Sequence, residues 1–220
     1  VSRWLNGQVE PRLPDFFCLV DAVSLRLLDL LTAMVQPADL PSAAEAWARL
    51  EAQRDLAIEK PYTQVVLRAI ELDSYKEQPF HQPGWIARKL GISLAAEESC
   101  LNALARAGQI KLADGRWVGE EVTVDTRRSP ESSRYLKSFW TQTALDRLQK
   151  GGDGRFAYNV FSISQADYEQ LKVLHGAYFR SLRALVADSH PPERVVLANV
   201  QLVPLDVPTR KPLASVVEER

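Results

Sequence analysis

The sequence predicts a mainly α-helical protein with a small α+β part. Three observations lead to this fold class. Apolar residues recur at helical spacing over most of the 220 residues. The pair Asp114-Gly115 separates two short runs in the manner of a hairpin turn. Two runs rich in β-branched and aromatic residues, 155–164 and 194–205, interrupt the helices of the last third and predict strands.

The totals are those of an ordinary globular protein, with room for one large or two to three small domains. A net charge of −1 gives no overall attraction to nucleic acid, so any DNA binding has to come from a local patch. No apolar run is long enough for a membrane span, and we expect no membrane partner. Two cysteines, Cys18 and Cys100, both on apolar helical faces, predict a reducing cytoplasm without disulfides.

Residues 1–41 form the first predicted piece, a partial helix-turn-helix. Val1–Gly7 predicts the end of a helix, and two helices follow at about Asp15–Val23 and Leu25–Met34. The chain opens inside a helix, so we expect an N-terminal portion before Val1 that carries the first helices of the domain.

The stretch VSRWLNGQVEPRLPDFFCLVDAVSLRLLDLL resembles the back half of a Cro/CI-type helix-turn-helix domain. The matching residues are Ser2, Arg3, Asn6, Gly7, Pro11, Leu13 and Leu19. The resemblance implies that Ser2, Arg3 and Asn6 contact phosphates or base edges, with Arg12 as a further candidate. The alternative is that Arg3 is a solvated surface charge and that Asn6-Gly7 only caps a helix.

Residues 42–60 predict a connector helix. Ser42 and Glu45 have the spacing of a capping box, in which each satisfies a backbone N–H group at the start of the helix. The helix continues through Trp47, Leu50 and Leu56, and Lys60-Pro61 breaks it.

The stretch 80–118 predicts a helix, a turn, a second helix and a hairpin. Gly84–Leu90 is the short helix, and Gly91 ends it because glycine tolerates the left-handed cap. Ser93 can cap the next helix, which Gly108 closes. The inward face of this helix is predicted at Leu94, Leu101, Leu104 and Ala105.

A preceding helix at Tyr62–Tyr75 supplies the apolar residues Val65, Val66, Ala69, Ile70 and Leu72. Ile110 and Leu112 then alternate with polar residues, and Trp117-Val118 returns after the turn. This order of elements is that of a winged helix, predicted over residues 61–120.

The second helix of this unit could read DNA through its predicted outward face, which consists of Ala95, Glu98, Ser99, Asn102 and Arg106. Glu97 and Glu98 at its start argue against this role, because carboxylates repel phosphates. Lys111 and Arg116 on the hairpin could contact phosphate. The alternative is a winged helix used for packing or dimerisation.

Residues 129–206 predict a C-terminal helix-strand-helix-strand unit, followed by a flexible tail at 207–220. Ser129-Pro130-Glu131 starts a helix that ends near Gln149, and Ser164 with Asp167 starts another that ends near Ala187. The inward residues of the two helices are predicted at Leu136, Phe139, Trp140, Thr143, Ala144 and Leu148, and at Leu171, Leu174, Tyr178, Leu182 and Leu185. The helix between the strands at 155–164 and 194–205 gives the crossover length that parallel pairing needs, and we expect this two-stranded sheet to pack on the helices or to pair across a dimer.

No catalytic or metal-binding pattern stands out, so we expect no enzyme and no cofactor. The chain has no phosphate-binding glycine loop, nucleophile elbow or zinc-ligand spacing. His81, His175 and His190 are scattered, and His175 is best explained by packing or by a satisfied hydrogen bond. Arg127, Arg128, Arg134 and Lys137 could bind an anion, but ordinary surface charge explains them as well.

The whole chain resembles a bacterial family that joins a Cro/CI-like (Xre-type) helix-turn-helix to a C-terminal domain of unknown function. The stretches that carry the resemblance are WIARKLGISLAAEESCLNALARAGQIKLADGRWV, SPESSRYLKSFWTQTALDRL, FAYNVFSIS and VQLVPLD. It implies a DNA-binding transcriptional regulator, which we expect to be cytoplasmic and to have an unknown effector or protein partner. We expect a homodimer, because dimeric DNA readers match two half-sites. The alternative is a protein-interaction adaptor whose helix-turn-helix units are scaffolds.

Overall fold

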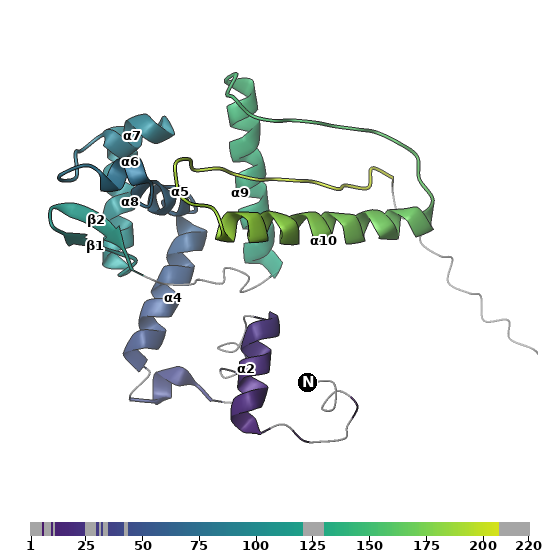
Figure 1. Cartoon of the computed structure of the whole chain (residues 1–220), viewed down its shortest axis with the longest axis horizontal. Coiled ribbons are helices and arrows are strands. Elements are labelled where there is room, and N and C mark those ends of the chain that lie inside the picture. Colours follow the sequence, from purple (N-terminus) through teal and green to yellow (C-terminus); the bar gives the residue numbers. More distant parts are fainter. Residues whose placement is uncertain are drawn as a thin grey trace, which may run out of the picture. The chain divides into compact units, whose positions relative to one another are not determined.

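The computed structural model describes the backbone of residues 6, 10, 12–24, 30, 32, 35–41, 44–120 and 130–206. It confirms a mainly α-helical protein with one small sheet among these residues (Figure 1). The chain divides into two compact units, Val1–Tyr135 and Leu136–Arg220, and each is described by itself. None of the described helices is long and apolar enough to cross a membrane.

The first unit begins with helix α2 (Leu13–Ser24) and the short 3-10 helix η1 (Pro37–Asp39). Helix α4 (Ala44–Glu59) follows and ends before Lys60-Pro61, as predicted. Ser42 of the predicted capping box and most of the helix predicted at Leu25–Met34 lie outside the described residues. Cys18 on α2 is exposed, so the prediction of an apolar face is wrong there.

The predicted winged helix is present. Helices α5 (Thr63–Ile70), α6 (Asp73–Lys76), α7 (Trp85–Leu90) and α8 (Leu94–Arg106) gather with a two-stranded hairpin, β1 (Ile110–Ala113) and β2 (Arg116–Gly119) (Figure 1). The strands pair antiparallel, with Leu112 opposite Trp117. Asp114 and Gly115 both have positive φ, of 49° and 74°, which is the turn geometry that the pair predicts.

The single helix predicted at Tyr62–Tyr75 is wrong, because the structure divides it into α5 and α6. Leu72 takes an extended conformation, with φ −60° and ψ 138°, and lies at the start of α6. This break changes the direction of the chain and lets Leu72 and Tyr75 both reach the core, where each is 1% exposed.

The core of the first unit lies among α4, α5, α7 and α8. Val66, Ile86 and Leu104 are fully buried. The prediction that Leu94 lies on the inward face of α8 is wrong: it occupies the first position of the helix and is 47% exposed. Leu112 on the hairpin is 60% exposed.

Two long helices, α9 (Pro130–Gln149) and α10 (Gln165–Ala187), match the predicted ranges. Ser164 caps α10 by accepting a hydrogen bond from the Asp167 amide at 3.1 Å. The predicted strands at 155–164 and 194–205 are wrong, because both segments are described and neither takes part in a sheet. Neither helix has a fully buried residue. The inward face predicted for α9 is half-buried except at Leu148, whereas on α10 the prediction is wrong at three of its five residues, which are exposed: Leu174, Tyr178 and Leu185.

Candidate nucleic-acid interface

The α7–α8 turn is built by local chemistry that the sequence predicts. Gly91 ends α7 in the left-handed conformation, with φ 67°. Ser93 begins α8 by accepting a hydrogen bond from the Ala96 amide at 3.1 Å. The outward face predicted for α8 is confirmed as exposed: Ala95, Glu98, Ser99, Asn102 and Arg106. Ser99 also accepts a hydrogen bond from the Lys60 ammonium group at 3.1 Å.

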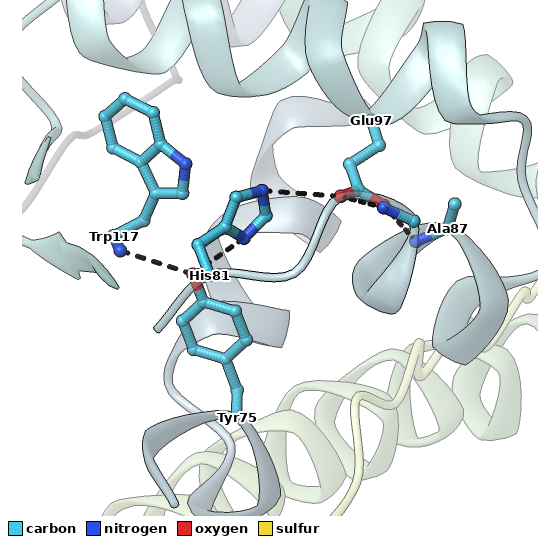
Figure 2. A network of polar contacts seen from close by, with 6 residues as sticks. Tyr75, His81, Ala87, Glu97 and Trp117 are labelled. Atoms are coloured by element: carbon cyan, nitrogen blue, oxygen red, sulfur yellow. Dashed lines mark hydrogen bonds and ion pairs between the residues drawn. The ribbon is translucent and has the colours of Figure 1, made fainter. Parts of the chain in front are cut away.

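Glu97 does not belong to this surface. Its side chain is fully buried, so the expectation that it would repel phosphates is wrong. The carboxylate accepts hydrogen bonds from the amides of Gly84 at 2.9 Å and Ala87 at 2.5 Å, at the start of α7 (Figure 2). No side chain of the α7 N-cap makes these bonds, since Gly84 has none. Glu97 therefore supplies from α8 the cap that α7 lacks.

The burial of Glu97 was not predicted, although the sequence contains a signal for it. Residues 97, 101 and 104 are spaced four and three apart, which places Glu97 on the same face of α8 as the buried Leu101 and Leu104. A carboxylate on such a face needs hydrogen-bond partners, and the free amides of the preceding turn are the nearest donors.

His81 and Tyr75 extend this buried network toward the hairpin, as Figure 2 shows. The Tyr75 hydroxyl accepts a hydrogen bond from the Trp117 amide at 3.2 Å and lies 3.1 Å from His81 Nδ1. The neutral imidazole has one N–H, and the Glu97 carboxylate near Nε2 favours its placement there; Nδ1 is then assigned as the acceptor of the Tyr75 hydroxyl hydrogen. Nε2 lies 3.7 Å from Glu97 Oε1, so its hydrogen points toward a negative charge.

The pKa values of two groups in this network are shifted. Burial lowers the pKa of His81, and the neighbouring Glu97 opposes that shift. Burial also raises the pKa of Tyr75, against the effect of the Trp117 amide. Both groups are thus favoured in their neutral forms, and the network links the hairpin to the α7–α8 turn as a structural connection.

The two predicted phosphate contacts on the hairpin already have partners within the unit. The Lys111 ammonium group lies 2.5 Å from Glu120 Oε1. The Arg116 guanidinium donates to the carbonyl oxygens of Lys76 and Gln78, the second at 3.3 Å. Arg116 therefore fastens the hairpin to the end of α6, and binding a phosphate would compete with those hydrogen bonds.

Of the predicted N-terminal contacts, Ser2 and Arg3 lie outside the described residues. Asn6 lies in an exposed turn, and Arg12 is exposed directly before α2. The structure does not bring these residues together with Lys111 and Arg116 into one described site.

A second group of cations on the winged helix was not predicted as a site. Arg88 and Lys89 are exposed at the end of α7 and line a shallow hollow. The other lining residues are Ser74, Glu77, Gln78 and Trp85. Glu77 in the same hollow offsets part of the positive charge, so the hollow is not a uniform anion site.

Two other residues considered for reactivity are Cys100, in the first unit of the chain, and His175, in the second. Cys100 is buried, and burial raises the pKa of its thiol, which lowers its reactivity. His175 has the satisfied hydrogen bond that the sequence predicts, since its Nε2 lies 3.1 Å from the Val200 carbonyl oxygen. The described residues contain no group of three or more His, Cys, Asp or Glu side chains that could hold a metal ion.

Comparison with known proteins gives one match. Residues 41–205 match the family model described as "Domain of unknown function (DUF4423)". No curated protein and no solved structure matches the chain. The match includes the connector helix, the winged helix and both long helices, and ends with the extended segment after α10. Since it covers well over half of the sequence, the chain belongs to the DUF4423 family.

Proposed function

We propose that this protein is a cytoplasmic, DNA-binding transcriptional regulator, in which the N-terminal helix-turn-helix segment reads the DNA. The observation that carries the class of function is the winged-helix architecture of residues 61–120. This fold recurs in DNA-binding proteins, although a fold alone does not determine function. The likeness of residues 1–31 to a Cro/CI-type domain supports the same class.

The charges of the described residues support the N-terminal segment as the reader of DNA. Lys111 is paired with Glu120, and Arg116 is bonded to backbone carbonyls. The first charged residue on the exposed face of α8 is Glu98, whose carboxylate would repel a phosphate that a cation at this position would attract. Arg12 and Asn6, in contrast, are exposed beside the segment that resembles a recognition helix. The winged helix then serves as the scaffold, without a catalytic role or a cofactor.

A salt-dependence experiment separates the two possible readers. Affinity for DNA selected from a random library is measured from about 50 to 300 mM salt for the full protein, Arg12→Ala and Lys111→Ala. Removing a cation that binds one phosphate reduces the slope of log K against log salt by about 0.9. We expect Arg12→Ala to reduce the slope and Lys111→Ala to leave it unchanged. Absence of any sequence preference in the selection would contradict the proposal.

The second candidate function is a protein-interaction adaptor. It is favoured by two large apolar side chains on the surface of the winged helix, Leu94 and Leu112, at 47% and 60% exposure. Affinity capture with and without nuclease distinguishes the two functions. An adaptor retains its partners after the DNA is digested and loses them in Leu94→Ser and Leu112→Ser, whereas a regulator of the proposed kind keeps its operator binding in both variants.

A further inference from the structure

Two segments of the C-terminal unit are extended but unpaired. Residues 155–163 and 190–206 make no backbone–backbone hydrogen bond among the described residues. Their sequences, RFAYNVFSIS at 155–164 and RVVLANVQLVPL at 194–205, are nevertheless those of strands. A strand of this composition is stable when its backbone groups join a ladder and one face is covered.

The second segment is held in its extended form by the helices of its own unit. Asn199 and Gln201, two residues apart, both donate to the Thr141 hydroxyl on α9, at 3.2 and 3.1 Å. Alternate residues of an extended chain share a face, so this pair of contacts fixes the orientation of the segment. The Val200 carbonyl lies against His175 of α10. The helices of the unit therefore hold this segment in an extended form, and no other described residue pairs with it.

The first segment is the more exposed of the two. Tyr158 is 95% exposed and Val160 is 74% exposed, values expected for unfolded chain rather than for a core. Large apolar side chains fill both segments: Phe156, Tyr158, Val160, Phe161 and Ile163 in the first, and Val196, Leu197, Val200, Val203 and Leu205 in the second. On α10, Leu174, Tyr178 and Leu185 add an exposed apolar stripe.

The exposed area is large enough for a stable dimer. At roughly 150–200 Å² for a fully exposed large side chain, the two segments alone leave on the order of 1,000 Å² of apolar surface in water. A standard protein–protein interface buries about 800 Å² per partner. Interfaces between identical subunits are also the more apolar class, which agrees with the composition of this surface.

The charges favour an antiparallel arrangement of two copies. Arg155 is the one charged residue of 155–164 and stands at its N-terminal end; Arg194 has the same place in 194–205, which Glu193 and Asp206 flank. Antiparallel pairing of the first segment with its own copy places the two Arg155 side chains at opposite ends of the ladder. Parallel pairing would place them side by side, where like charges repel. A two-fold axis produces the antiparallel arrangement.

We propose that the C-terminal unit is completed by a second copy of this chain, with residues 155–164 of the two copies pairing as antiparallel strands. The apolar side chains of 194–205 and the α10 stripe are then covered by the same partner. This inference does not depend on DNA binding, and its test contains no DNA, so the two proposals can fail separately.

Measurement of the mass in solution is the first test. Light scattering after size exclusion, at about 10 µM, is expected to give twice the 24.7 kDa of the chain. Val160→Lys and Val196→Lys each place two new cations in the interface, and we expect the dimer dissociation constant to rise roughly 100-fold or more. Leu112→Lys makes the same change on an exposed apolar residue of the hairpin and should leave the mass unchanged. Thermal unfolding of the winged helix monitors the folding of each variant.

A cysteine scan tests the pairing itself without a disruptive charge. In a chain with Cys18→Ser and Cys100→Ala, each residue of 156–163 is replaced in turn by cysteine and oxidised mildly. Around a two-fold axis the distance between a residue and its own copy grows by about 7 Å per residue, because both strands move apart by one step. Crosslinking is therefore expected at one position with a sharp decline on either side. Leu112→Cys, on the hairpin, is the control, and we expect no crosslink from it.

Four results would overturn the proposal. The chain could be monomeric throughout the micromolar range, or the dimer could persist in both lysine variants while Leu112→Lys dissociates it. Crosslinking could also be absent, or uniform across 156–163, which would mean that the segments meet by collision. The chain could also be a monomer in which the amides of 155–164 become protected from hydrogen exchange only when a different protein is added. That result would mean that the surface binds the other protein and not a second copy.

Discussion

The winged helix and the C-terminal unit are built from similar helices but differ in what fills their interiors. α8 buries Leu101 and Leu104 against its neighbours and uses a buried carboxylate to cap α7. α9 and α10 are longer, yet neither has a buried residue. Helix length and amphipathic pattern therefore do not determine whether a unit has a core of its own. The winged helix is complete within one chain, and we expect the C-terminal unit to need a partner.

The largest expected effect tests the core of the winged helix. Leu104 is fully buried, so Leu104→Ala should lower the free energy of unfolding by about 2–5 kcal/mol through reduced burial and the resulting cavity. Leu174→Ala makes the same change on the exposed stripe of α10 and should alter the unfolding of the winged helix by less than about 0.5 kcal/mol. Urea denaturation followed by tryptophan fluorescence measures both. Equal losses would contradict the contrast between the two units.

The next effect concerns the carboxylate that caps α7. Glu97→Gln keeps the size of the side chain but places an NH₂ group or a weaker acceptor against the amides of Gly84 and Ala87. We expect a loss of about 1.5–3 kcal/mol in the free energy of unfolding, the usual value for hydrogen bonds to a charged group. Glu98→Gln is the matched control on the exposed face, with an expected change within about 0.5 kcal/mol. If the two variants were equally stable, Glu97 would not be the cap.

A smaller effect is expected from pH. Because burial lowers the pKa of His81 in the folded state, the unfolded chain binds that proton more readily. The contribution of His81 to stability is therefore complete above about pH 6.5 and decreases as the pH falls below that value. Urea denaturation at pH 7.5 and 5.5 should show this decrease, and it should be reduced in His81→Asn. A steeper decrease in His81→Asn would mean that folding raises the pKa of His81 instead of lowering it.

The parts of the fold that depend on neighbouring residues could be predicted from the sequence. Asp114-Gly115, Gly91 and Ser93 act through local backbone geometry, and the structure has each of them in the predicted role. The break at Leu72 and the burial of Glu97 depend on contacts between elements distant along the chain, which local patterns do not contain. The strand composition of 155–164 and 194–205 could be read from the sequence, but not that both stay unpaired among the residues that the structure describes.

In the candidate interface, too, local features could be predicted from the sequence and contacts between distant residues could not. The exposed face of α8 followed from helical periodicity and is confirmed. The pairing of Lys111 with Glu120 and of Arg116 with the carbonyls after α6 could not be predicted, because each depends on how the hairpin folds back. The DNA contacts of Ser2 and Arg3 remain predictions, and so does the reading of DNA by the N-terminal segment.

Hydrogen–deuterium exchange at several protein concentrations tests the central contrast most directly. We expect the amides of α5 and α8 to be protected at every concentration, and those of 155–164 to become protected only as the chain dimerises. Protection of 155–164 should follow the dimer fraction and be lost in Val160→Lys. Protection of 155–164 that is independent of concentration, or its absence in a chain that is fully dimeric, would contradict pairing of this segment between two copies.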